Sequence, residues 1–375
     1  MTKNFLLITC FSLCSLLTSN TTKALTAPVG VRPCCAFGQD LKTELLGVPI
    51  PFFSVENVVD TSRLGKHIYN DGSQNVIARL LGLSDESNGL IFTSKGGFID
   101  TAHVRDTADF TYYLYQQIRQ HLGSHYRIIL PTELRARHIR LQENKQVLTN
   151  KEKQSLSLEL AALLAFRLAQ WHEIAQWFGY ESIIGFPEYV SAFSPEDLYS
   201  NMLGAITAKQ VLEQQPDLSP SDFSQAMTDA FNDQLQQLGS VSAEETKRHI
   251  QQLNGQWWDH NTRLPQKWVV LKRDYQLGLT RYPNGVKNDI PLSLSTQLSN
   301  GDNNSMWAEL YLHNVGNEET FNALPHELKN NMVWQPAQFQ QLANFAKQQD
   351  HKERGKSTQV VKEKVSKYSL TTNYL

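Results

Sequence analysis

The chain has 375 residues, of which 41% are hydrophobic and 19% are charged, and its formal net charge is −2. This composition is typical of a globular protein with a substantial core, and it excludes collagen-like, coiled-coil and wholly disordered chains. The balanced charge provides no general basic field for nucleic acid. Four cysteines are too few to form the disulfide framework of a chain this long.

The first residues predict a secretory signal peptide. Lys3 supplies a short positive region, Phe5–Leu17 is mostly apolar, and small residues precede a possible cleavage site after Ala24. The apolar run is too short to span a bilayer unaided. We therefore expect residues 1–24 to be removed and the chain to reach the periplasm or cell envelope. Cleavage is favoured over lipid anchoring, and no transmembrane anchor is expected afterwards.

Helices and short strands alternate along the first half of the remaining chain. Pro and Gly residues predict an extended segment at the start, and Asp100 is a good helix N-cap. In chain order we expect an extended segment over 25–60, a helix over 61–83, a hairpin over 88–99, a helix over 101–122 and a short strand over 126–130.

The strongest helix prediction covers residues 155–178. This segment is apolar on nearly all sides, which predicts a central position in the core. Its charged residues, including Glu173, argue against a membrane span. The run Ser194–Asp197 is typical of a helix start, with Ser194 as the cap and two acids in the first turn. The helices expected after it cover residues 198–214, 219–238 and 242–253.

These elements predict a mainly α (α+β) protein, with a helical core and a small β-hairpin and short-strand element. A further short strand is expected over 268–271, and the Lys-rich residues 347–367 predict a solvated helix or a loose tail. The expected organisation is a signal peptide (1–24), a mainly helical core domain (25–300) and a polar C-terminal segment packing on the core (301–375).

Two predicted helices each carry a histidine and a carboxylate on faces expected to be buried. His103 lies in the middle of the apolar arc of its helix and Asp106 lies at the border of that arc. His172 lies on a face of small residues in the central helix, next to Glu173. Buried polar groups of this kind are costly unless they have partners.

Together these four residues predict a catalytic site that binds Zn²⁺ or another divalent metal, since imidazole and carboxylate are ligands of such ions. Glu188, in the loop after the central helix, is a further candidate ligand. The alternative is a buried hydrogen-bonded network that fixes the register of the helices. Helix capping is sufficient to explain the presence of Glu196 and Asp197 at the start of a predicted helix.

Three stretches resemble an exported bacterial family, DUF4056, known only as a domain of unknown function. They are Arg32–Gly38, Gly96–Asp106 and Ser191–Asn201. The resemblance covers most of the chain after the signal peptide. It implies a bacterial envelope protein and transfers no activity.

The chain also carries a second, separate resemblance. Asn88–Phe92 followed by His103 is similar to the strand-and-histidine segment of papain-like cell-wall cysteine peptidases. In that group a cysteine at a helix N-terminus lies upstream, as Cys35 does here. The resemblance implies Cys35 as nucleophile and His103 as base. The chain departs from the group because a helix, not a strand, is predicted around His103. The adjacent Cys34 is a poor disulfide partner for Cys35, because neighbouring cysteines form a strained ring.

Three hypotheses follow for the function. The first is an exported metal-dependent hydrolase acting on an envelope component or polymer, with an activated water as nucleophile. The second is a papain-like cysteine hydrolase. The third is a non-catalytic envelope scaffold whose buried polar residues only organise the core. Neither a phosphate-binding loop nor a dinucleotide fingerprint is present in the sequence.

Overall fold

The computed structural model describes residues 25–371, except 31, 33–35, 46–47, 56, 74–84, 183–186, 288 and 317. At residue 45 and over residues 48–55 and 356–371 it describes the backbone but not the side chains. The predicted signal peptide and both Cys34 and Cys35 therefore lie outside the described residues.

The described chain is 44% helix and 15% strand, with small antiparallel sheets, so the predicted α+β class is confirmed. The helices are α2 (Thr101–His121), α3 (Asn150–Trp177), α4 (Asp197–Gln214), α5 (Pro220–Leu238), α6 (Ala243–Gln252), α7 (His326–Lys329) and α8 (Pro336–Thr371). The strands are β1 (Leu41–Leu45), β2 (Val48–Val55), β3 (Leu90–Thr93), β4 (Gly97–Asp100), β5 (Tyr126–Glu133), β6 (Arg135–Leu141), β7 (Thr280–Arg281), β8 (Leu292–Ser293), β9 (Ala308–His313) and β10 (Val333–Trp334).

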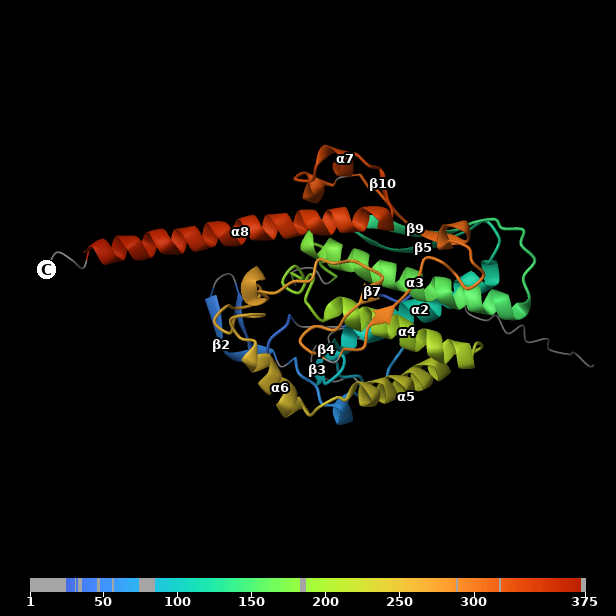
Figure 1. Cartoon of the computed structure of the whole chain (residues 1–375), viewed down its shortest axis with the longest axis horizontal. Coiled ribbons are helices and arrows are strands. Elements are labelled where there is room, and N and C mark those ends of the chain that lie inside the picture. The colour runs from blue at the N-terminus through green and yellow to red at the C-terminus, as the bar shows by residue number, and fades with distance from the viewer. Residues whose placement is uncertain are drawn as a thin grey trace, which may run out of the picture.

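Helices α2, α3 and α4 pack together at the centre of the molecule (Figure 1). Along α3, residues from Leu156 to Gln176 are buried on most sides, as the apolar sequence predicts. Gly204 of α4 allows a close approach to α2, because a Cβ there would lie only 2.1 Å from the carbonyl oxygen of Val104. The start of α8 packs beside α3 (Figure 1). Among the described helices, none combines the length and apolar character needed to cross a bilayer.

The largest sheet has the strand order β10-β9-β6-β5 and is antiparallel throughout. One face carries buried residues such as Ile139 and Leu310, while alternate residues are more exposed. The prediction that a strand ends at residue 130 is wrong, because β5 continues to Glu133. An irregularity in register between Leu130 and Glu133 accommodates Pro131, whose carbonyl oxygen accepts a hydrogen bond from Arg137 Nε at 2.6 Å.

The predicted helix over 61–83 is wrong in its described part. Only Thr61–Arg63 forms a 3-10 turn, and the chain from 64 to 73 is irregular. Its backbone donors are used by other elements: for example, the N–H of His67 donates to Thr228 Oγ1 at 2.8 Å, and that of Asn70 to Asp109 at 3.1 Å. These tertiary bonds replace the bonds that a helix would make.

The expected strand over 268–271 is also wrong, because Lys267–Val269 forms a 3-10 turn. Val270 makes a single bridge to Trp258 and no longer ladder. By contrast, the hairpin β3–β4, the Asp100 cap of α2 and the helix predicted over 219–238, which is α5, agree with the sequence predictions. Helix α3 begins at Asn150, earlier than predicted, because Thr149 and Glu152 form a capping box.

Replacing Gly204 with alanine tests the contact between α2 and α4. Alanine is the better helix former, yet its Cβ would overlap the Val104 carbonyl, so we expect Gly204→Ala to lower the free energy of unfolding by about 1–3 kcal/mol. Gly278→Ala is the control, because the nearest heavy atom to its Cβ lies 3.7 Å away. Equal unfolding midpoints in urea for Gly204→Ala and the wild type would contradict the close packing.

Candidate metal centre

One polar cluster lies where three helices meet. Its residues come from the first turn of α2, the second half of α3 and the start of α4: Asp100, His103, Glu173 and Asp197. The side chain of His103 is 11% exposed, and the three carboxylates are at most 2% exposed. Ionisable groups this deeply buried need partners.

Asp100 serves both the helix and the cluster. Its Oδ1 accepts from the backbone N–H groups of Ala102 at 2.8 Å and His103 at 3.3 Å, which caps α2. Its other oxygen, Oδ2, lies 3.4 Å from His103 Nδ1. Asp100 therefore fixes one side of the imidazole ring and leaves Nε2 facing the other two helices.

Two carboxylate oxygens converge on His103 Nε2. Glu173 Oε1 lies at 3.5 Å and Asp197 Oδ2 at 3.7 Å. Both oxygens are buried, and neither accepts a hydrogen bond from any described residue. The second oxygen of Glu173 accepts from the N–H of Phe193 at 2.6 Å, which holds the carboxylate in place. Each unsatisfied oxygen thus lies beside the same ring nitrogen.

A fourth buried carboxyl, Glu196, lies next to Asp197. The hydroxyl of Ser194 contacts both of its oxygens at 2.8 Å. Burial raises the pKa of Glu196 to about 8 in spite of that hydrogen bond. Burial also raises the pKa of Asp197 well above its ordinary range; His103 opposes this shift, and Glu173 adds to it.

The nearest buried cation does not neutralise this cluster. The guanidinium of Arg273 donates to the carbonyl oxygens of Ala192, Val190 and Lys267, which organises the loop before α4. Among the described residues it makes no ion pair with Glu173 or Asp197, and its contact with a carboxylate is to Asp350 at 3.8 Å. The cluster therefore contains more buried carboxyls than cationic side chains.

The donor set matches that of a metal site. Asp100, His103 and Asp197 each offer one ligand atom, and these atoms lie within 4.8 Å of one another. Such a buried group could hold a metal ion, because imidazole nitrogen and carboxylate oxygen are ordinary ligands of divalent cations.

The residues expected to form one site are divided among three networks. His103 and Glu173 lie together in the cluster described above. Asp106 instead contacts Arg32: its Oδ1 lies 2.6 Å from a guanidinium nitrogen, and its Oδ2 accepts from the backbone N–H at 3.0 Å. Asp106 is thus paired within a separate ionic network.

His172 belongs to a third network. Its Nδ1 lies 3.3 Å from Glu133 Oε1, and its Nε2 lies 2.9 Å from Gln176 Nε2 and 3.9 Å from Glu188 Oε2. Burial alone would lower the pKa of His172, but the Glu133 carboxylate raises it above its ordinary value. Glu188 therefore folds back toward His172, and both stay apart from His103.

Sequence reasoning did not include Asp100 and Asp197 in the site, because a cap was a sufficient explanation for each. Asp100 is indeed a cap. The prediction of Ser194 as the cap of α4 is wrong, because Glu196 occupies the cap position and makes no side-chain cap bond. Asp197 is buried. The apolar residues before each acid, Phe98-Ile99 and Ala192-Phe193, were the available signal, since they place both acids at the edge of the core.

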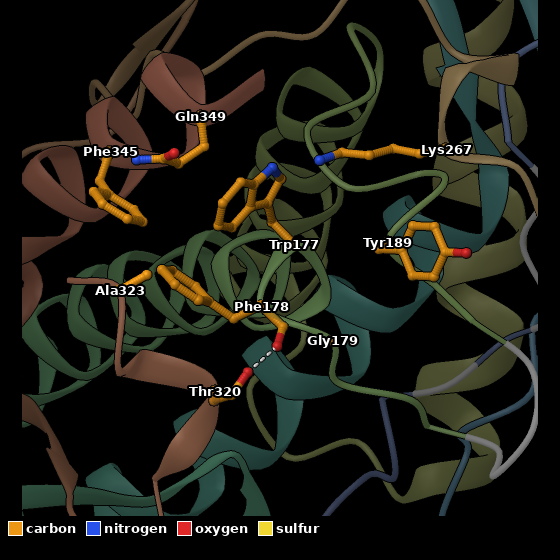
Figure 2. Close-up of a pocket in the computed structure, with 9 residues that line it drawn as sticks. All are labelled: Trp177, Phe178, Gly179, Tyr189, Lys267, Thr320, Ala323, Phe345 and Gln349. Atoms are coloured by element: carbon orange, nitrogen blue, oxygen red, sulfur yellow. Dashed lines mark hydrogen bonds between the residues drawn. The ribbon is translucent and has the colours of Figure 1, made fainter. Parts of the chain in front are cut away.

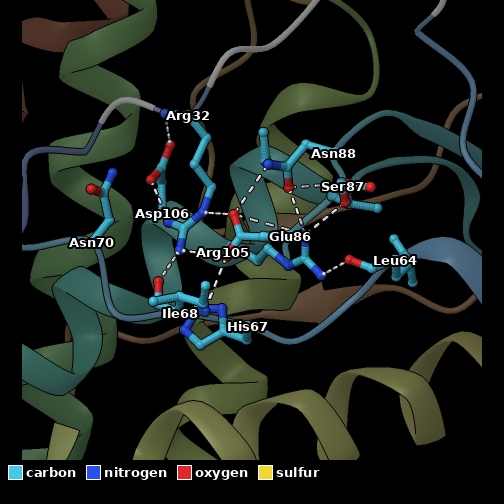
Figure 3. A network of polar contacts seen from close by, with 12 residues as sticks. Arg32, Leu64, His67, Ile68, Asn70, Glu86, Ser87, Asn88, Arg105 and Asp106 are labelled. Carbon is cyan, nitrogen blue, oxygen red and sulfur yellow. Dashed lines mark hydrogen bonds and ion pairs between the residues drawn. The ribbon is translucent and has the colours of Figure 1, made fainter. Parts of the chain in front are cut away.

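The Arg32 network attaches the N-terminal segment to α2 (Figure 3). Arg32 is fully buried and pairs with Glu86 at 2.6 Å, Asp106 at 2.6 Å and Asp109 at 2.8 Å. His67 Nε2 lies 2.9 Å from the other oxygen of Asp109. Here the buried carboxylates are matched by a guanidinium, unlike those around His103.

A pocket of about 340 Å³ lies at the end of α3 (Figure 2). Aromatic side chains line much of it, and the hydroxyl of Thr320 at its rim donates to the carbonyl oxygen of Phe178. Lys267 lies 4.9 Å from the centre of the Trp177 ring and pairs with Asp350 at 2.5 Å. None of the four residues of the candidate metal centre lines this pocket.

The chain belongs to the family described as "Protein of unknown function (DUF4056)", whose model matches residues 22–287. All four residues of the candidate metal centre lie within the matched range. No curated protein and no solved structure matches the chain. The family establishes no activity, so the function has to be argued from the site.

Removing the buried guanidinium tests the Arg32 network. We expect Arg32→Gln to lower the free energy of unfolding at pH 7 by about 3–5 kcal/mol, because three carboxylates would lose their shared partner. The exposed pair of Arg119 and Asp217 is the control, and Arg119→Gln should cost at most about 1 kcal/mol.

The difference in free energy of unfolding between the wild type and Arg32→Gln depends on pH because of Glu86. Burial alone would raise its pKa, but Arg32 and then Arg105 hold it well below the ordinary range. The resulting stability is present above the unfolded pKa of about 4.3 and is lost as pH falls through the folded pKa. Urea titrations of the wild type and Arg32→Gln should therefore converge below about pH 4. A constant difference down to pH 2 would contradict this pairing.

Proposed function

We propose that the chain is an exported metal-dependent hydrolase. Its metal is held by His103 and Asp197, two of the three residues whose ligand atoms lie within 4.8 Å of one another, together with Glu173, which faces the same ring nitrogen. One observation carries the proposal: two buried carboxylate oxygens without hydrogen bonds face the same imidazole nitrogen, at 3.5 and 3.7 Å. An unpaired buried acceptor costs about 1–3 kcal/mol, and more when charged. A cation at this point would satisfy both oxygens and the ring nitrogen.

The separations fit a small divalent ion. Ligand atoms about 2.0–2.1 Å from a tetrahedral zinc ion lie roughly 3.3 Å from each other, which is close to the two distances to His103 Nε2. Two carboxylates would balance the double charge of the ion. Asp100, beside Nδ1, then has the position of a carboxylate that orients a metal-bound histidine.

The same donors favour Zn²⁺ and remain compatible with Mn²⁺ or another divalent ion, because carboxylate-rich sets suit harder cations. An ion bound by three protein ligands lowers the pKa of a water molecule and makes it a nucleophile for hydrolysis. The chain's own contribution is to orient His103 through Asp100 and to hold Glu173 through the Phe193 N–H.

The location and the substrate class rest on the sequence. The signal-like N-terminus favours export, and an exported hydrolase encounters envelope polymers and lipids. The competing proposal is a non-catalytic scaffold in which the cluster stays metal-free and only organises three helix ends.

Metal analysis of the mature protein, purified without a His tag, tests the centre. We expect about one divalent ion per chain, lost in His103→Gln and Asp197→Asn, because each change removes a ligand. His172→Gln is the matched control on α3 and should keep its metal, since His172 contacts Glu133 and Gln176 instead. Full metal content in His103→Gln, or a metal-free wild type after purification with added zinc, would refute the site.

Hydrolysis is tested separately with p-nitrophenyl acetate, p-nitrophenyl phosphate and purified cell-wall polymer. We expect turnover by the metal-loaded wild type, a loss of at least about 100-fold in Asp197→Asn, and near-normal turnover in His172→Gln. A protein that binds metal stoichiometrically but turns over none of these substrates would favour the scaffold.

A further inference from the structure

We infer that the outer face of the large sheet binds a phosphate group through Arg127 and Arg140. The outer face includes seven side chains on β5, β6 and β9: Arg127, Ile129, His138, Arg140, Glu309, Tyr311 and His313. Nothing in the candidate metal centre contributes to it, so the inference does not depend on the proposed function.

Strand register brings these side chains together. Arg127 is directly opposite Arg140, and His138 is opposite both Ile129 and Tyr311. Successive side chains of a strand point to opposite faces, and the residues between these are buried. Arg127 is exposed, and Ile129 is 63% exposed. The face is therefore accessible from outside the core.

The paired arginines lack a carboxylate partner. Like charges directly opposite on neighbouring strands are destabilising, and residues so paired have Cβ atoms about 4.5–5.5 Å apart. Among the described residues, no carboxylate oxygen lies within 4.0 Å of either guanidinium. Glu309, opposite Arg140 on β9, instead accepts from Gln335 Nε2 at 2.9 Å. An external anion would supply the missing charge.

Neighbouring aromatic rings hold the guanidinium of Arg140 in place. It lies 4.4 Å from the centre of the Tyr311 ring, and one of its terminal nitrogens lies 2.9 Å from His313 Nε2. The rings of His138 and His313 are 4.8 Å apart. Arg140 Nε and His138 Nδ1 are buried atoms with no hydrogen-bond partner among the described residues. These contacts fix the position of the Arg140 guanidinium on the face.

The electrostatic surroundings agree with an excess of positive charge. Burial lowers the pKa of His138, and Arg127 and Arg140 lower it further. For His313 burial is again the largest cause, followed by His138 and Arg140. Glu309 is the acidic group nearest in register, and its own pKa is raised by burial. The two arginines therefore add to the effect of burial in disfavouring the protonated form of both histidines.

Charge and geometry favour phosphate over carboxylate. Two guanidiniums require two negative charges, and a phosphomonoester carries about −1.5 to −2 at pH 7, with three strong acceptor oxygens. A carboxylate would leave one arginine uncompensated. Arginine also binds phosphate through two parallel hydrogen bonds. The exposed Ile129 and the Tyr311 ring flank the arginines and can contact an organic part of the ligand.

Titration calorimetry with inorganic phosphate at low ionic strength tests the site. We expect saturable binding of one phosphate per chain, weakened about tenfold or more in the double variant Arg127→Gln/Arg140→Gln. Arg248→Gln removes one positive charge from the exposed surface of α6, as each of the single variants Arg127→Gln and Arg140→Gln does from the sheet, and should leave binding unchanged. Arg140→Lys should also weaken binding, because lysine keeps the positive charge but lacks the planar guanidinium that makes two parallel hydrogen bonds to phosphate.

Two controls in the phosphate titration identify the results that would overturn the sheet site. Phosphate bound to a metal at His103 would persist in the double variant and disappear in His103→Gln, which would overturn the sheet site while supporting the metal centre. Acetate binding as tightly as phosphate, or no saturation up to 10 mM phosphate (a limit of about −2.7 kcal/mol), would also overturn it. In that case the arginines serve only to protect the edge strand β5 from pairing with other chains.

The source of the phosphate is distinguished by vesicles of phosphatidylcholine with and without phosphatidic acid. Sedimentation with the phosphatidic acid vesicles alone, lost in the double variant, identifies a lipid headgroup as the ligand. Binding of free phosphate without vesicle binding identifies a soluble phosphorylated ligand. Either result supports the site, whereas vesicle binding that survives in the double variant contradicts it.

Discussion

The close packing of α2, α3 and α4 is the constraint on which the candidate metal centre depends. Gly204 allows α4 to approach the backbone of α2 at Val104, next to His103. That approach brings the N-termini of α2 and α4 to the same place, with Glu173 of α3 beside them. Helix N-termini carry partial positive charge, which favours the acids Asp100 and Asp197 at these positions. The helix ends reduce the cost of burying these carboxylates but provide no hydrogen bond for two of the oxygens.

The structure contains two buried clusters of carboxylates, and their negative charges are compensated in different ways. Around Arg32, a buried guanidinium donates to Glu86, Asp106 and Asp109, so every acid has a cationic partner within 2.8 Å. Around His103, the nearby Arg273 donates to backbone carbonyl groups, and its carboxylate contact is with Asp350 outside the cluster. The first arrangement is structural, because its charges are satisfied internally. The second leaves two carboxylate oxygens without hydrogen bonds beside one imidazole nitrogen, which is what distinguishes a candidate binding site from an ionic core.

Sequence periodicity predicted His103 and Glu173 as buried polar groups, and these two residues meet. Their contact at 3.5 Å links helices 70 residues apart in sequence, and a helical wheel cannot show which faces of two helices will touch. His172 was paired with His103 by the same reasoning, but the helix turns it by about 100° from Glu173, toward Glu133 on β5. Asp106 lies one turn beyond His103 and forms an ion pair with Arg32.

Local patterns in the sequence were enough to predict the α+β class, the central helices and the Asp100 cap, because apolar periodicity and capping act over a few residues. Only the tertiary structure decided the identity of the cluster, since Asp100 and Asp197 are ordinary helix-start residues until α4 packs against α2. The same holds for the outer sheet face, where Arg127 and Arg140 become neighbours only through the register of β5 and β6. Contacts between distant segments depend on packing and register, which no local pattern encodes.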